Sequence, residues 1–75
     1  MDFMMVKRVV GNALVPVAID LDHICLVQHS TIDLFKDTTR FVIAGFEDVY
    51  LEPHDAKRVC KAIGVDYDFL LKQVN

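Results

Sequence analysis

Two histidines and a cysteine at alternate positions are the residues best suited to chemistry in this chain. His23, Cys25 and His29 lie in the stretch HICLVQH, and a regular β-strand points such positions to one face. Imidazole and thiolate groups bind zinc, but a structural zinc site needs four ligands. The fourth would have to be His54 or Cys60, and the spacing matches no compact zinc motif. We therefore expect no metal site and no cofactor.

Nucleophilic catalysis would need a cysteine activated by a neighbouring base. His23 stands near Cys25 in the sequence and His54 near Cys60, so two pairs can be drawn. Cys60 falls on the apolar side of an expected helix, where a thiol is desolvated and inert. The spacing of His54 and Cys60 also does not bring their side chains together on a helix. Neither pair predicts a catalytic cysteine.

Paired carboxylates are the other possible catalytic group. General acid–base work needs one carboxylate to be desolvated so that its pKa rises. Asp20 with Asp22, and Glu47 with Asp48, both fall in expected solvated turns, and neither has the spacing of a calcium loop. The three glycines are isolated and form no phosphate-binding loop. The sequence therefore predicts that the protein is not an enzyme.

The charge balance disfavours nucleic-acid binding. The net charge is −3, with 8 basic against 11 acidic residues, whereas a nucleic-acid binder carries a basic patch. Two helices expected near the carboxyl end could imitate a helix-turn-helix, but the second one, DYDFLLKQV, would repel phosphate. The alternative function is a small DNA-binding regulator whose dimer gathers its cations on one surface: Lys7, Arg8, Arg40, Lys57, Arg58 and Lys61.

The size and hydrophobicity indicate a single domain with an interface. A chain of 75 residues buries only roughly 60% of its unfolded surface. Yet 53% of the residues are hydrophobic and the mean hydropathy is +0.32. Because small domains often gain stability by association, we expect a homo-oligomer. No apolar run is long enough to cross a membrane, the amino terminus has no signal-peptide layout, and two cysteines make no disulfide framework. These features favour the cytoplasm.

The first half of the chain predicts β-strands. Met4–Val10 and Ala13–Ile19 flank a Gly-Asn pair, with glycine first as a type II′ hairpin turn requires. Pro16 cannot donate to a ladder, so it predicts that the second strand is an edge or carries a bulge. Asp20-Leu21-Asp22 predicts a turn, followed by a third strand over His23–His29. Ser30–Phe35 either extends the sheet or forms a loop.

The second half predicts two more strands and two helices. Phe41–Ala44 and Val49–Leu51 have strand patterns. Gly45–Asp48 either turns the chain back between them, which we prefer, or is a bulge in one long strand. Pro53 suits the first position of a helix and Gly64 a helix end. Asp66 is expected to cap a second helix over Tyr67–Val74. Strands followed by helices predict an α+β domain over residues 1–75, with a meander-like antiparallel sheet of four to five strands and one or two helices packed on one face.

The strand pattern also carries a resemblance. The stretch VAIDLDHICLV, followed by RFVIAGFEDVYLEP and a helix, is similar to small β-meander proteins of the bacterial flagellar-regulator kind and to LytTR domains. The similarity covers about positions 15–63 and consists of apolar spacing and turn residues. It implies a meander and carries over no functional residue.

The function expected from these features is that of a non-enzymatic interaction module. It would be a small regulator or inhibitor that docks on a larger protein, as a homo-oligomer. Aromatic side chains are favoured interface anchors. The candidate contact residues are Phe46, Tyr50, Tyr67 and Phe69.

Overall fold

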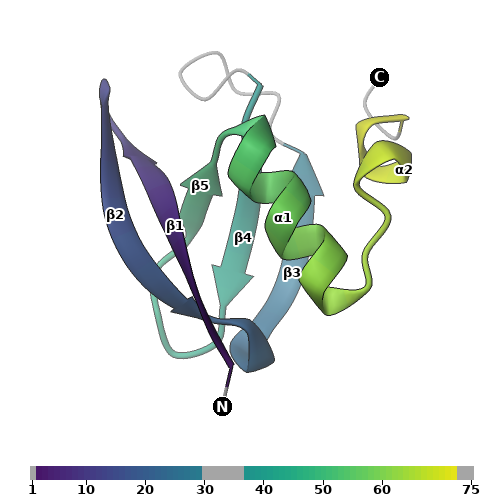
Figure 1. The fold of residues 1–75 in the computed structure, drawn as a ribbon, viewed down its shortest axis with the longest axis horizontal. Helices are drawn as coiled ribbons and strands as arrows, with labels where there is room; N and C mark the ends of the chain where they lie inside the picture. The colour runs from purple at the N-terminus through teal and green to yellow at the C-terminus, as the bar shows by residue number, and fades with distance from the viewer. Residues whose placement is uncertain (1, 30–36, 73–75) are drawn as a thin grey trace.

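The computed structural model describes residues 2–29 and 37–72, which form a five-stranded antiparallel sheet followed by two helices (Figure 1). The elements in chain order are β1 (Phe3–Val10), β2 (Ala13–Asp20), the 3-10 helix η1 (Leu21–His23), β3 (Ile24–His29), β4 (Thr39–Ile43), β5 (Val49–Leu51), α1 (Pro53–Ile63) and α2 (Tyr67–Lys72). The predicted α+β fold is confirmed. Ser30–Phe35 and the end of the expected second helix lie outside the described residues.

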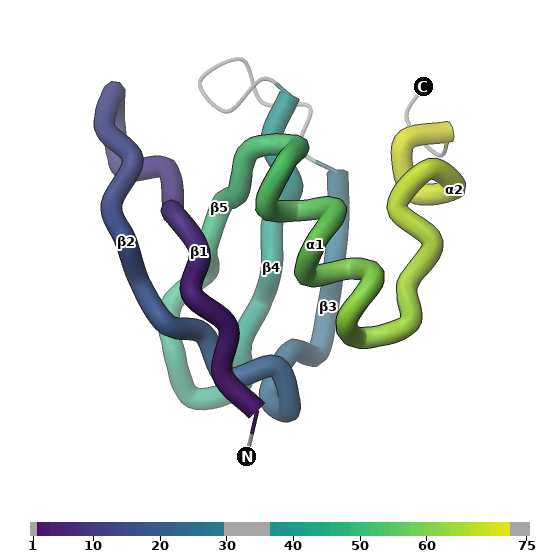
Figure 2. The backbone as a smooth tube through the Cα atoms, viewed as in Figure 1, coloured from purple at the N-terminus to yellow at the C-terminus, as the bar shows by residue number. Residues whose placement is uncertain are grey.

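The strand order is β2-β1-β5-β4-β3, and every pair is antiparallel. The β1–β2 hairpin and the β3-β4-β5 meander join where β5 lies beside β1, through the pairing of Arg8 with Leu51. The backbone trace in Figure 2 follows the same path, with β2 and β3 at the two ends of the sheet and converging only where η1 connects them. Within residues 2–29 and 37–72 the sheet therefore has two free edges, one along β2 and one along β3.

The hairpin forms as the sequence predicts. Val10 pairs with Ala13 across the turn, and Gly11 has a φ of +59° while Asn12 does not share this left-handed conformation. A positive φ at the first central residue alone is the mark of a type II′ turn. Pro16 lies on the edge strand, opposite Lys7. The edge position that its missing N–H predicts is confirmed.

The third strand begins later than predicted. His23 lies in η1, and β3 starts at Ile24. The register then shifts between Ile24 and Leu26, so that Cys25 is an extra residue in a β-bulge. Asp20 starts the 3-10 helix by accepting a hydrogen bond from the Asp22 N–H at 3.0 Å. The expectation of one regular strand over His23–His29 is therefore wrong.

The core lies between the sheet and α1. Its buried side chains are Val6, Ile19, Phe41, Ile43, Val49, Leu51, Ala56, Val59 and Cys60. Alternate residues of β4 and β5 point to this side, as strand periodicity requires. We call this the inner face of the sheet.

The first helix has the ends that the sequence predicts, and the second begins where it predicts. Pro53 is the first residue of α1, and Gly64 ends it in the left-handed conformation with a φ of +80°. The Val65 N–H donates to the Cys60 carbonyl at 2.8 Å. This is the hydrogen bond of a Schellman motif that spans more residues along the chain. Asp66 caps α2 by accepting from the Phe69 N–H at 3.1 Å.

Candidate functional site

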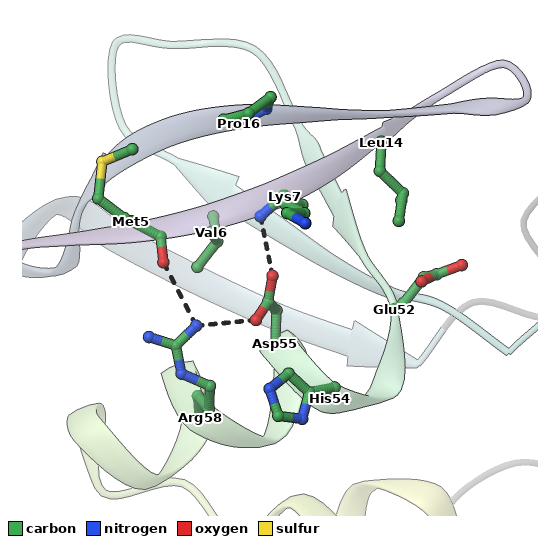
Figure 3. Close-up of a pocket in the computed structure, with 9 residues that line it drawn as sticks. All are labelled: Met5, Val6, Lys7, Leu14, Pro16, Glu52, His54, Asp55 and Arg58. Atoms are coloured by element: carbon green, nitrogen blue, oxygen red, sulfur yellow. Dashed lines mark hydrogen bonds and ion pairs between the residues drawn. The ribbon is translucent and has the colours of Figure 1, made fainter.

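A hollow lies between the hairpin and the first turns of α1 (Figure 3). Its volume is about 450 Å³. It is lined by Met5, Val6, Lys7, Leu14, Pro16, Glu52, His54, Asp55 and Arg58. The hairpin supplies its apolar side and the helix its polar side, so we call it the hairpin groove.

The polar side of the hairpin groove is a clasp between α1 and the backbone of β1. The Asp55 carboxylate accepts a hydrogen bond from the Lys7 N–H at 2.8 Å. Arg58 donates to the Met5 carbonyl at 3.3 Å and to the Asp55 carboxylate at 2.8 Å. Because β5 ends at Leu51, this part of β1 has no strand beside it there. The two helical side chains take the hydrogen bonds that a longer β5 would have made.

The clasp holds Asp55 in its charged form. Burial opposes ionisation of this carboxyl, but the hydrogen bond from the Lys7 N–H and then the Arg58 guanidinium outweigh it. The pKa of Asp55 therefore lies below its usual value. A carboxylate that stays ionised and fully hydrogen-bonded is poorly suited to proton transfer near neutral pH. The geometry therefore gives Asp55 a structural role.

The apolar side of the hairpin groove continues along the whole hairpin. Cross-strand partners in a sheet share a face, and the register pairs Met5 with Ala18, Lys7 with Pro16, and Val9 with Leu14. Met5 is 61% exposed and Leu14 is 45% exposed. We define the hairpin face as Phe3, Met5, Lys7, Val9, Leu14, Pro16 and Ala18. Asp20 lies opposite Phe3 at the end of this face, so the surface is apolar except for Lys7 and this terminal carboxylate.

A second hollow adjoins the end of the hairpin face. Phe3 and Ala18 line it together with Phe46 from the β4–β5 turn, and its volume is about 280 Å³. Phe3 is 57% exposed and Phe46 is 65% exposed. One predicted contact residue, Phe46, therefore extends the apolar surface of the hairpin face.

The structure does not bring the four predicted contact residues together. Phe46 lies in the β4–β5 turn and Phe69 on α2, at opposite ends of the fold (Figure 1). Tyr50 alternates with the buried Val49 and Leu51, so it lies on the outer face of the sheet. Tyr67 packs against the core and hydrogen-bonds to the buried Thr39. Phe46 and Phe69 are exposed, whereas the two tyrosines are half-buried.

The candidate catalytic and metal-binding residues are also separated. His23 is 2.7 Å from the Asp20 carboxylate, and Cys25 donates to the Val42 carbonyl at 3.4 Å. Cys60 is fully buried, and burial raises the pKa of its thiol to about 11. In residues 2–29 and 37–72, no three His, Cys, Asp or Glu side chains are placed to hold a metal ion.

Three of the cations in the alternative DNA-binding surface are neutralised by carboxylates. Arg8 pairs with Glu47 and donates to the Asp48 carbonyl at 3.0 Å. Arg40 lies 2.7 Å from the Asp48 carboxylate, and the Asp55–Arg58 ion pair forms part of the clasp. The turn at Glu47 and Asp48 is solvent-exposed, with the Glu47 side chain 67% exposed, and its ion pairs also tie it to β1 and β4. The arginines that would face phosphates are thus engaged within the protein.

Sequence reasoning missed the hairpin face. The available signal was Pro16: an edge strand has neighbours on one side only, so its apolar residues are poorly covered. The clasp left no such signal, because Asp55 and Lys7 are 48 positions apart. Its aspartate resembled an ordinary first-turn acid that complements the helix dipole.

Comparisons with protein-family models, with curated proteins and with solved structures found no match to this chain. Within the described part of the chain, no helix has the length and apolar character needed to cross a membrane.

Proposed function

We propose that this protein is a non-enzymatic interaction module that works by docking on a larger protein, as a regulator or inhibitor, and that it self-associates. The observation that carries the proposal is the hairpin face. Monomeric proteins seldom expose large contiguous apolar patches, and such patches mark interaction sites. The cross-strand pairs make this surface continuous from Phe3 to Leu14.

Self-association through the hairpin face accounts for the high apolar content of so small a chain. Phe3, Met5 and Leu14 are all at least 45% exposed, and burying them against a second copy would remove apolar area from water at about 25 cal/mol per Å². The flexible stem of Lys7 can lie along apolar surface with its ammonium in water, and Asp20, at the end of the face, is engaged by the Asp22 N–H and His23. A two-fold dimer needs a self-complementary patch of this kind.

Light scattering on a sizing column across a dilution series tests self-association. We expect a mass near twice the monomer's 8.5 kDa. Leu14→Lys should shift the protein to monomer because it buries a charge in the interface. Leu26→Lys is the matched control, since Leu26 on β3 is also 45% exposed but lies on the opposite edge. A wild-type monomer at all concentrations would contradict self-association.

The DNA-binding alternative receives no support from the geometry. Its arginines are held in ion pairs with Glu47, Asp48 and Asp55. Binding phosphate would mean breaking these contacts, which lowers the gain from each new one. Measurable duplex binding that falls steeply with added salt would nevertheless favour this alternative over the docking module.

A further inference from the structure

The free edge of β3 offers main-chain groups to a further strand. The Ala44 N–H donates to the His23 carbonyl at 2.8 Å, on either side of the Ile24–Ile43 pair. In an antiparallel ladder this pattern marks a pair whose own N–H and C=O groups point away from each other. The register past the bulge pairs Leu26, Val27 and Gln28 with successive residues of β4. The backbone N–H and C=O groups of Leu26 and Gln28 therefore point to β4, whereas those of Val27 point to the free edge.

An apolar hollow runs along this edge. Its volume is about 460 Å³, and Ile24 and Val27 line it from β3 while Val65 and Leu70 line it from the helical segment. Leu26 lines the same hollow, although its side chain alternates with that of Val27. The hollow therefore wraps around the strand edge itself. Every described side chain that lines it is uncharged.

The helical layer extends beyond the sheet on this side. In Figure 1, α2 lies past β3, on the side away from β4, and it contacts β3. A strand added to β3 would therefore lie between the sheet edge and α2, with one set of alternate side chains against Leu70 and Val65. Peptide-binding domains that work by strand addition use the same combination of an open edge and flanking apolar pockets.

We propose that the β3 edge binds an extended segment of a partner protein, which adds to the sheet as a sixth strand. The segment carries apolar side chains at alternate positions and no charge where it faces the hollow. This inference names the partner contact of the proposed docking module and rests on that function. It uses a surface separate from the hairpin face.

A second copy of this chain is a poorer occupant of the β3 edge than a single segment. Two β3 strands paired about a two-fold axis perpendicular to the sheet would place both helical layers on the same side. Since α2 already lies beyond the edge (Figure 1), it would meet the helices of the second copy. One extended segment brings no helical layer.

A phage-displayed library of random linear 12-residue peptides, selected on the intact protein, tests the proposal. We expect enriched peptides with apolar residues at alternate positions. In a synthetic copy of one such peptide, methylating the amides that pair with β3 should weaken binding at least tenfold, and methylating the intervening amides should not. Failure to enrich any peptide, or equal effects at all amides, would overturn the proposal.

Protein variants locate the binding edge. Val27→Pro removes the N–H that points to the free edge and should lower the affinity for the synthetic peptide at least tenfold. Val27→Ala keeps this N–H and should retain most of the affinity. Leu26→Lys should also weaken binding, and Leu14→Lys on the hairpin face should leave it unchanged. Circular dichroism checks that each variant is folded.

A chemical block gives a second readout that needs no substitution. Cys25 is exposed and lines the hollow, whereas Cys60 is buried, so N-ethylmaleimide should modify Cys25 selectively and abolish peptide binding. Peptide binding that survives this block and Val27→Pro would overturn the edge assignment. If instead Val27→Pro abolishes self-association, the occupant is a second copy and the inference is wrong. A wild-type monomer that still binds the peptide would contradict self-association alone.

Discussion

The two free edges of the sheet, β2 and β3, differ in how their backbones are protected. Both strands are rich in apolar residues, and among the described residues each has a neighbouring strand on one side only. On β2, the residue opposite Lys7 is Pro16, and the Lys7 N–H points away from β2 toward Asp55. The backbone groups of two paired residues in an antiparallel ladder both point away from each other in such a pair. The backbone nitrogen of Pro16 therefore points to the free edge, where proline has no N–H to donate.

The β3 edge has no such proline. Its irregularity is the bulge at Cys25, and bulges also discourage strand pairing. The bulge, however, leaves Leu26–His29 in regular register with β4. The comparison indicates that one edge is closed to new strands while the other is open over a short stretch, next to an apolar hollow. A third stretch of backbone without a neighbouring strand lies on β1, and the hydrogen bonds of the clasp satisfy its Lys7 N–H and Met5 carbonyl.

The largest expected effect comes from placing proline on the paired side of β3. Gln28→Pro removes the N–H that faces β4 and should lower the free energy of unfolding by about 2 to 3 kcal/mol. Val27→Pro removes an N–H that faces the edge, so it should cost only the packing of a half-buried valine, about 1 kcal/mol. Urea unfolding measures both.

The control for side-chain loss is Gln28→Ala, which keeps the backbone donor and should be nearly neutral. If Val27→Pro destabilises the fold as much as Gln28→Pro, the assignment of which residues face the edge is incorrect, and the contrast between β2 and β3 no longer holds.

A smaller effect is expected at the clasp. Asp55→Ala leaves the Lys7 N–H and Arg58 without their acceptor and should cost about 2 kcal/mol. Asp55→Asn keeps an acceptor oxygen and should cost about half as much. Thermal and urea unfolding at neutral pH measure the difference. An Asp55→Ala variant as stable as the wild type would show that water replaces the carboxylate.

The clasp also makes a pH-dependent contribution. Because the folded pKa of Asp55 lies below the usual value of 3.8, its contribution to stability is fully present above pH 3.8. It is lost as the pH falls through the lowered folded pKa. The stability difference between the wild type and Asp55→Asn should therefore narrow at acid pH, as measured by urea unfolding between pH 2 and 5.

Local patterns account for the parts of the fold that could be predicted from the sequence. Gly11 predicted the hairpin turn and Pro16 predicted the edge strand. Pro53 and Gly64 predicted the two ends of α1. Each of these residues acts through its own backbone geometry or that of its immediate neighbours. The antiparallel sheet followed by helices was predicted for the same reason.

The parts that could not be predicted depend on distant contacts. The placement of β5 beside β1 rests on the pairing of Arg8 with Leu51, and nothing in either strand specifies the other. The start of β3 at Ile24 is instead a local effect that the prediction missed, because Asp20 meets His23 only three residues away and η1 extends through His23. The candidate contact residues were chosen by side-chain type, which does not determine whether a side chain is exposed. Phe46 and Phe69 are exposed, whereas Tyr67 packs against the core.

The smallest expected effect on stability, and the most direct test of the two edges, is Pro16→Val. The substitution gives β2 an outward N–H without breaking any bond within the chain, so its stability should change by less than about 1 kcal/mol. The β2 edge should then resemble β3 and pair with other molecules, so that the mass by light scattering rises with concentration beyond that of the wild type. Pro16→Lys also restores the N–H, but its charge opposes edge pairing and lies in the hairpin face, so its mass should not exceed that of the wild type. If Pro16→Val keeps the wild-type mass, Pro16 does not protect the β2 edge, and the difference between the edges lies in the hollow beside β3.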